Sequence, residues 1–131
     1  MALTLPPFLR KVILADAIVS GAAAFLMIAG AGMLGPLLSL PAALLSWAGI
    51  SLVPFVILLF AIIRRGAAPR LLVLDVAIVN ILWAAASFAI LAAGVVSPNL
   101  PSVLFVAAQA LVVAVFALLQ LKGLRSAPLA A

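Results

Sequence analysis

Few residues of this chain could carry acid–base, nucleophilic or metal chemistry. The sequence contains no His, Cys or Tyr, and its only two acidic residues are Asp16 and Asp75. Ser–His and Cys–His nucleophiles are therefore impossible, and so is zinc or haem ligation by His or Cys. We expect a protein that is not an enzyme and that holds no metal and no cofactor.

The two aspartates lie in apolar stretches, where an acid is costly and is often functional. Asp16 and Asp75 each lie about one helical turn inside the end of such a stretch, where the positive end of a helix dipole favours an acid. One expectation is an interfacial ion pair with a neighbouring arginine (Arg10, Arg64, Arg65 or Arg70). The alternative is a carboxylate that faces a cytoplasmic vestibule and couples to a proton or another cation.

Two amides, Asn80 and Gln109, lie deeper in their apolar stretches. Helical spacing places each amide on a polar face: Asn80 with Trp83 and Ser87, and Gln109 with Ser102 and Gln120. Because an unpartnered amide in hydrocarbon costs several kcal/mol, we expect the two faces to meet, with Asn80 and Gln109 bonded directly or through a shared partner. The faces would serve helix packing or line a small polar pocket, walled by Trp83 and reached from the cytoplasmic side.

The elements that must position these residues are membrane-spanning helices. Of the 131 residues, 70% are hydrophobic and 7% are charged, which excludes a water-soluble globule. Four apolar stretches of the length that crosses a bilayer follow one another: residues 12–34, 41–63, 71–95 and 101–121. The predicted fold is an all-α, four-transmembrane-helix bundle in a single domain, residues 1–131, with no strands. The first stretch is longer than the core of a secretion signal, so we expect it to be retained.

The basic residues predict how the chain is oriented. All seven flank the four stretches on one side: Arg10, Lys11, Arg64, Arg65, Arg70, Lys122 and Arg125. Since basic residues in short loops stay in the cytoplasm, both termini are predicted to be cytoplasmic, in a bacterial inner membrane. The same residues would contact lipid headgroups. Their dispersal over three segments argues against nucleic-acid binding.

An internal repeat and a stripe of small residues indicate how the helices associate. Sliding the chain by 60 residues aligns segment 10–65 with segment 70–125, matching Arg10 with Arg70 and Pro41 with Pro101. This predicts two parallel helical-hairpin repeats. On the third stretch, Ala85, Ala89 and Ala93 recur every four residues, which is typical of a close helix contact.

The sequence resembles an uncharacterised family of small bacterial four-span integral membrane proteins. The resemblance rests on short motifs spread over the chain, among them Asp16 with Ser20-Gly21, Leu40-Pro41 and Asn80 with Trp83. It implies a bacterial membrane protein and adds no activity. We expect a non-enzymatic structural or accessory subunit that associates with itself or with a membrane complex. The alternative is a small-solute or proton-coupled transporter, working as a homodimer, with a binding site at Asp16, Asp75, Asn80, Trp83 and Gln109.

Overall fold

Four long helices make up most of the protein in a computed structural model that describes residues 2–38, 41–93 and 99–126. They are α1 (Pro7–Ala29), α3 (Ala42–Arg65), α4 (Arg70–Ala93) and α5 (Leu100–Ser126). Each is long and apolar enough to cross a membrane. The mostly helical, four-span class that the sequence predicts is therefore supported, and the protein is a multi-pass membrane protein by the length and composition of its helices.

The first helix differs most from its predicted bounds. It begins at Pro7 instead of residue 12, because proline suits the first turn of a helix and the following Arg10 and Lys11 are good helix formers. It also ends early, where the N–H of Gly30 bonds to the carbonyl of Leu26, and a separate short helix, α2 (Ala31–Leu38), follows. Apolar content located the lipid-facing part of this segment but not the ends of its helix.

The prediction that the chain has no strands is wrong. Strand β1 (Ala2–Thr4) pairs antiparallel with β2 (Ala67–Pro69), which lies between α3 and α4. Gly66 makes this possible: its φ of 68° ends α3 in a left-handed turn, and its carbonyl accepts a bond from the N–H of Leu5. The sequence argument considered strands only as part of a membrane barrel, whereas this short ribbon ties the N-terminus to a loop.

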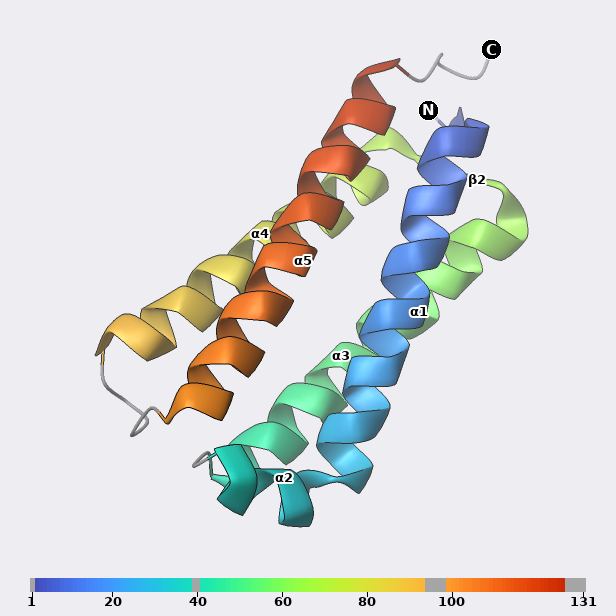
Figure 1. Ribbon diagram of the computed structural model, residues 1–131. Coiled ribbons are helices and arrows are strands. Elements are labelled where there is room, and N and C mark those ends of the chain that lie inside the picture. The colour runs from blue at the N-terminus through green and yellow to red at the C-terminus, as the bar shows by residue number, and fades with distance from the viewer. Residues whose placement is uncertain (1, 39–40, 94–98, 127–131) are drawn as a thin grey trace.

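The helices associate as two antiparallel pairs, α1 with α3 and α4 with α5, and the pairs meet mainly along α1 and α5 (Figure 1). Near the N- and C-terminal end, Gly123 of α5 lets the two helices approach: a Cβ at Gly123 would lie 3.1 Å from the Cβ of Leu9. The Lys122 ammonium lies 5.9 Å from the ring centre of Phe8 at the same crossing. The two pairs are the hairpins that a repeat of 10–65 and 70–125 requires, but the repeat itself stays a prediction.

Both described ends of the chain and β2 lie at one end of the bundle (Figure 1). The positions of all seven basic residues place them in the helix turns at this end, which we call the basic end. Here a cluster of buried apolar side chains that includes Leu9, Ile13, Leu59 and Val73 fills the space between the helices. Which aqueous compartment faces the basic end stays a prediction.

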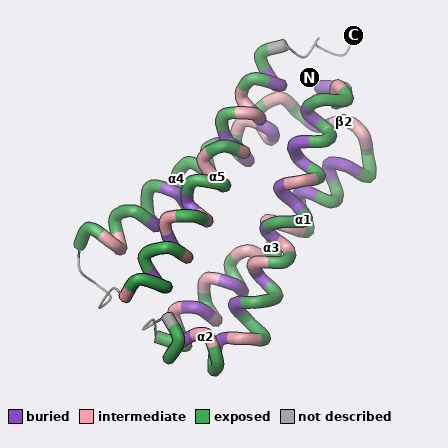
Figure 2. Tube along the Cα trace, in the orientation of Figure 1, coloured by how far each residue is buried: buried purple, intermediate pink, exposed green. Residues whose placement is uncertain are grey.

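Exposed residues recur along all four long helices (Figure 2), and many of them are large and apolar. Phe25, Trp47, Leu71 and Leu118 are each more than 60% exposed, and each belongs to a different long helix. Exposed apolar surface on this scale is unfavourable in water and is what a lipid-facing helix presents.

Candidate functional site

A fully buried carboxylate, Asp16, lies at the centre of a polar network between three helices. Its Oδ1 accepts a 2.8 Å hydrogen bond from the Ser20 hydroxyl, one turn further along α1. Its Oδ2 accepts from Asn80 Nδ2 of α4 at 2.8 Å and from Gln120 Nε2 of α5 at 2.7 Å. Asn80 Nδ2 also donates to Gln120 Oε1, at 3.0 Å. Asp16 is 0% exposed, so these bonds replace all of its contact with solvent.

A second polar network, further from the basic end, joins α4 to α5 around Gln109. Trp83 Nε1 donates to Gln109 Oε1 at 2.8 Å. Gln109 Nε2 donates to the Ser87 hydroxyl at 2.8 Å and to the carbonyl of Val106 at 2.9 Å. The Ser87 hydroxyl donates in turn to the carbonyl of Trp83. Both amide hydrogens of Gln109 are therefore used within the bundle.

The two predicted polar faces do meet, but the predicted link between Asn80 and Gln109 is wrong. Asn80 bonds to Asp16 and Gln120, while Gln109 bonds to Trp83, Ser87 and Val106, so they share no partner. The reason is depth, because Asn80 lies about 10 Å nearer the basic end along α4 than Ser87, the residue that Gln109 contacts.

The expectation that Asp16 pairs with an arginine is also wrong. Asp16 is fully buried and is bonded to three neutral donors, from Ser20, Asn80 and Gln120, and to no arginine among the described residues. Helix α1 starts before the basic residues, so Arg10 and Lys11 lie about one and a half turns nearer the basic end than Asp16, and both are exposed. Asp75 is exposed on α4 and is not part of either network. The structure therefore separates two aspartates that the sequence treats alike.

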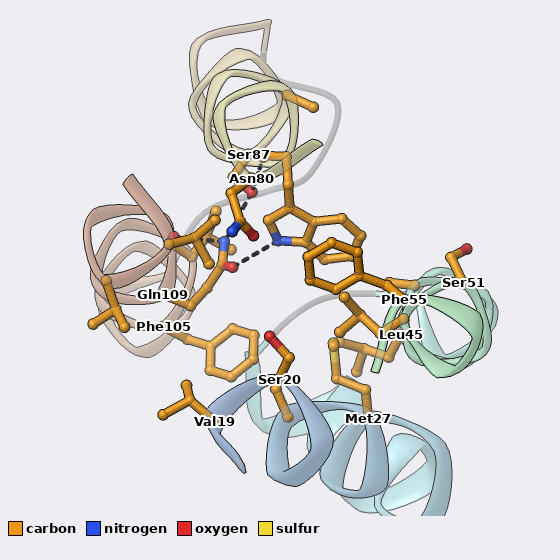
Figure 3. A pocket seen from close by; sticks show the side chains of 18 of the residues that line it. Val19, Ser20, Met27, Leu45, Ser51, Phe55, Asn80, Ser87, Phe105 and Gln109 are labelled. Carbon is orange, nitrogen blue, oxygen red and sulfur yellow. Dashed lines mark hydrogen bonds between the residues drawn. The ribbon is translucent and has the colours of Figure 1, made fainter. Parts of the chain in front are cut away.

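A cavity of about 700 Å³ lies between the two helix pairs and is lined by all four long helices. Its wall is largely apolar, with Met27, Leu45, Phe55 and Phe105 among the labelled side chains in Figure 3. Some lining residues are exposed, Ser51 among them, so the cavity reaches the surface of the bundle.

A few polar groups interrupt the apolar wall of the cavity. Ser20 and Asn80 line the part nearest the basic end, which we call the floor, and the Gln109 network lines the wall further from that end. The labelled residues of both groups are drawn in Figure 3. Trp83 lines the cavity, as the pocket alternative predicts. The cavity does not reach the basic end, where the apolar cluster fills the space between the helices, and the predicted approach from the cytoplasmic side stays a prediction.

Sequence reasoning missed Ser20 and Gln120 as site residues. Ser20 lies four residues after Asp16, the spacing that puts two side chains on one helix face. Gln120 belongs to the polar stripe of α5 and is 0% exposed.

The site offers hydrogen bonds and one carboxylate, but no cluster of metal-binding side chains. Within residues 2–38, 41–93 and 99–126, no three His, Cys, Asp or Glu side chains converge. Of the remaining predicted residues, the seven basic ones lie away from the cavity, at the basic end.

Comparison with known proteins adds no assignment: no protein-family model, no curated protein and no solved structure matches this chain. The resemblance to a family of small bacterial four-span proteins stays a prediction. The four long apolar helices support the coarser class of a multi-pass membrane protein.

Proposed function

We propose that this protein binds a small, mostly apolar molecule with a polar end inside the bilayer, as a binding protein or carrier that catalyses no reaction. The observation that carries the proposal is the cavity of about 700 Å³, whose largely apolar wall carries a few polar groups. Ligand pockets commonly measure about 300–1,000 Å³ and combine an apolar wall with a few placed polar groups. This favours the transport alternative of the sequence analysis over a purely structural role.

The two tryptophans provide a direct test of binding. Trp83 lines the cavity, whereas Trp47 is 68% exposed on the outside of α3. In a Trp47→Phe variant, Trp83 becomes the only indole, and a brominated ligand that enters the cavity quenches its fluorescence. We expect saturable quenching by bromophenyl-butanol, an uncharged amphiphile, in detergent micelles.

A cavity-filling variant separates binding in the cavity from partitioning into the micelle. Ala48 of α3 lines the cavity, whereas Ala61 of the same helix is exposed and does not. Ala48→Phe in the Trp47→Phe background should weaken the probe's affinity by about tenfold or more, since the loss of several buried contacts exceeds 1.4 kcal/mol. Ala61→Phe should leave the affinity unchanged. Quenching that rises linearly with probe and is the same in both variants would contradict the proposal.

A second candidate is the accessory or self-associating role. Ala85, Ala89 and Ala93 are exposed on α4, so the predicted small-residue contact does not lie within this chain. Such a stripe allows the close approach of a helix from another protomer or membrane protein. Energy transfer between labelled copies in vesicles tests this role: Ala89→Phe should reduce the transfer, and the equally exposed Leu82→Phe should not. Equal transfer in both variants would count against association through this face.

We also propose that the basic end faces the cytoplasm of a bacterial cell, with the helices in the inner membrane. The support is the positive-inside rule applied to seven basic residues at one end of the bundle.

A further inference from the structure

We propose that the cavity selects an amphiphile whose polar end is an ammonium group, bound at the floor between Ser20 and Asn80. This inference rests on the proposed function and names the chemical class of its ligand. It is carried by an unused acceptor on a buried side chain and by the charge behind it.

The unused acceptor is the side-chain oxygen of Asn80. Both amide hydrogens of Asn80 are engaged, by Asp16 Oδ2 and by Gln120 Oε1. Its Oδ1 accepts no hydrogen bond from any described residue, and since no fully buried side-chain N or O atom among those residues lacks a partner, this oxygen is open to the cavity that Asn80 lines. The orientation is fixed, because a reversed amide would turn its oxygen toward the Asp16 carboxylate. The floor therefore presents an acceptor oxygen that a hydrogen-bond donor of a ligand can bind.

Ser20 presents a second acceptor to the same space. Its hydroxyl hydrogen is used in the bond to Asp16 Oδ1, while the hydroxyl oxygen faces the cavity (Figure 3). A hydroxyl oxygen has two lone pairs, so it can accept while it donates. A ligand group with several N–H donors can therefore bond to Asn80 and Ser20 together.

The carboxylate of Asp16, which lies behind the floor, favours a ligand whose donor group is cationic over one whose donor group is neutral. We take Asp16 to be ionised in this inference because every described group bonded to it donates, as groups do to a carboxylate, which only accepts. None of its partners is cationic, and no Lys or Arg is found among the described residues that line the cavity. A buried charge without a counter-ion is costly, so an arriving cation gains more here than a neutral group does.

The depth and the wall of the cavity define the rest of the ligand. Asn80 lies near the middle of α4, so the ammonium is held deep among apolar helices. Phe55, Phe105 and Trp83 line the same cavity and suit an apolar or aromatic body. A free amphiphilic amine fits this depth better than the ammonium of an aminolipid, whose headgroup belongs at the membrane surface.

The test compares three probes of similar shape in the Trp47→Phe background: bromophenyl-butylammonium, bromophenyl-butanol and bromophenyl-pentanoate. After correction for each probe's partitioning into the micelle, the ammonium should bind about tenfold or more tightly than the alcohol, and the pentanoate more weakly than both. Equal affinity for ammonium and alcohol, or preference for the pentanoate, overturns this inference. If the alcohol also fails to bind in a saturable way, the proposed function fails as well, so the two failures are distinguishable.

Two aspartate variants identify the source of the selectivity. Asp16→Asn should abolish the preference, bringing the affinities for ammonium and alcohol within about twofold of each other. Asp75→Asn, which removes the other acid from an exposed position, should keep the full preference. A preference that survives Asp16→Asn overturns the role of this carboxylate. If Asp16→Asn does not fold, the three-probe comparison still decides the ligand class.

A second experiment varies the lipid, to distinguish a free amphiphilic amine from the ammonium headgroup of a phospholipid. Ammonium binding is measured in nanodiscs of phosphatidylcholine alone and in nanodiscs that also contain phosphatidylethanolamine. Unchanged affinity supports a free amphiphilic amine, as proposed. Affinity that falls as phosphatidylethanolamine increases shows that the headgroup occupies the floor and overturns the assignment to a free amine.

Discussion

The bond between Asn80 and the buried Asp16 should contribute more to stability than polar contacts in membranes usually do. Asn80→Leu removes the 2.8 Å bond to Asp16 Oδ2 and leaves Gln120 Oε1 without the donor that it has at 3.0 Å. Polar pairs in membrane proteins contribute about 0.6 kcal/mol on average, because other partners are found in the unfolded state. A hydrogen bond to an ionised group contributes about 1.5–3 kcal/mol to the free energy of unfolding. A buried acceptor that is left without a donor lowers that free energy by about 1–3 kcal/mol.

Asp16 is fully enclosed, so no solvent replaces the donor that the substitution removes. We therefore expect Asn80→Leu to lower the free energy of unfolding by about 2–4 kcal/mol. Unfolding in mixed micelles with a rising fraction of sodium dodecyl sulfate, followed by far-ultraviolet circular dichroism, measures this change. Val79→Leu, at the exposed neighbouring position, is the control and should stay within about 0.5 kcal/mol of the parent protein.

A double-mutant cycle isolates the contribution of the charge. In an Asp16→Asn background, Asn80→Leu should cost about 1–2 kcal/mol less than in the parent, because the bond that it removes no longer involves an ionised acceptor. The reasoning is refuted if Asn80→Leu is as stable as Val79→Leu. It is equally refuted if the cost of Asn80→Leu is the same with and without the Asp16 charge.

Three further predictions concern packing, the turn and orientation. A Cβ at Gly49 would lie 2.7 Å from Ile28 Cγ1 and 3.0 Å from the carbonyl oxygen of Ala24, so Gly49→Ala should lower the free energy of unfolding by about 1–3 kcal/mol. Gly21→Ala should not, since the nearest side-chain atom there is 3.6 Å away; equal losses in the two variants would contradict the described crossing of α1 and α3. Gly66→Ala should cost about 1 kcal/mol in the same assay because its φ is positive, and a neutral result would argue against the left-handed turn. Green fluorescent protein fused after Arg125 should fluoresce and alkaline phosphatase at the same position should be inactive, whereas the opposite pattern would reverse the proposed orientation.

The helices were predictable from hydropathy over a bilayer-length segment, and their polar faces were predictable from the 3.6-residue helical period. A bilayer demands long apolar helices with internally satisfied backbones, and four such segments are visible in the sequence. The 3.6-residue period then places Asn80, Trp83 and Ser87 on one face, and all three do contribute to the site. The helix that begins at Pro7 and the Gly66 turn follow from backbone preferences that hydropathy does not include.

The network around Asp16 was not predictable from hydropathy and periodicity alone. These signals place a residue on a face and at a depth, but they do not say which helices are neighbours. Asp16 and Gln120 are 104 residues apart in sequence and meet only because α1 packs against α5. The cavity depends on the same fact, since it exists where the two helix pairs separate beyond that contact.

The most direct test of the account is an experimental structure of the protein in a lipid environment. The account predicts a carboxylate of Asp16 bonded to Ser20, Asn80 and Gln120, with the Asn80 oxygen facing a cavity between the α1–α3 and α4–α5 pairs. A structure in which Asp16 forms an ion pair with an arginine, or in which the two helix pairs close on each other and leave no cavity above Asn80, would contradict it.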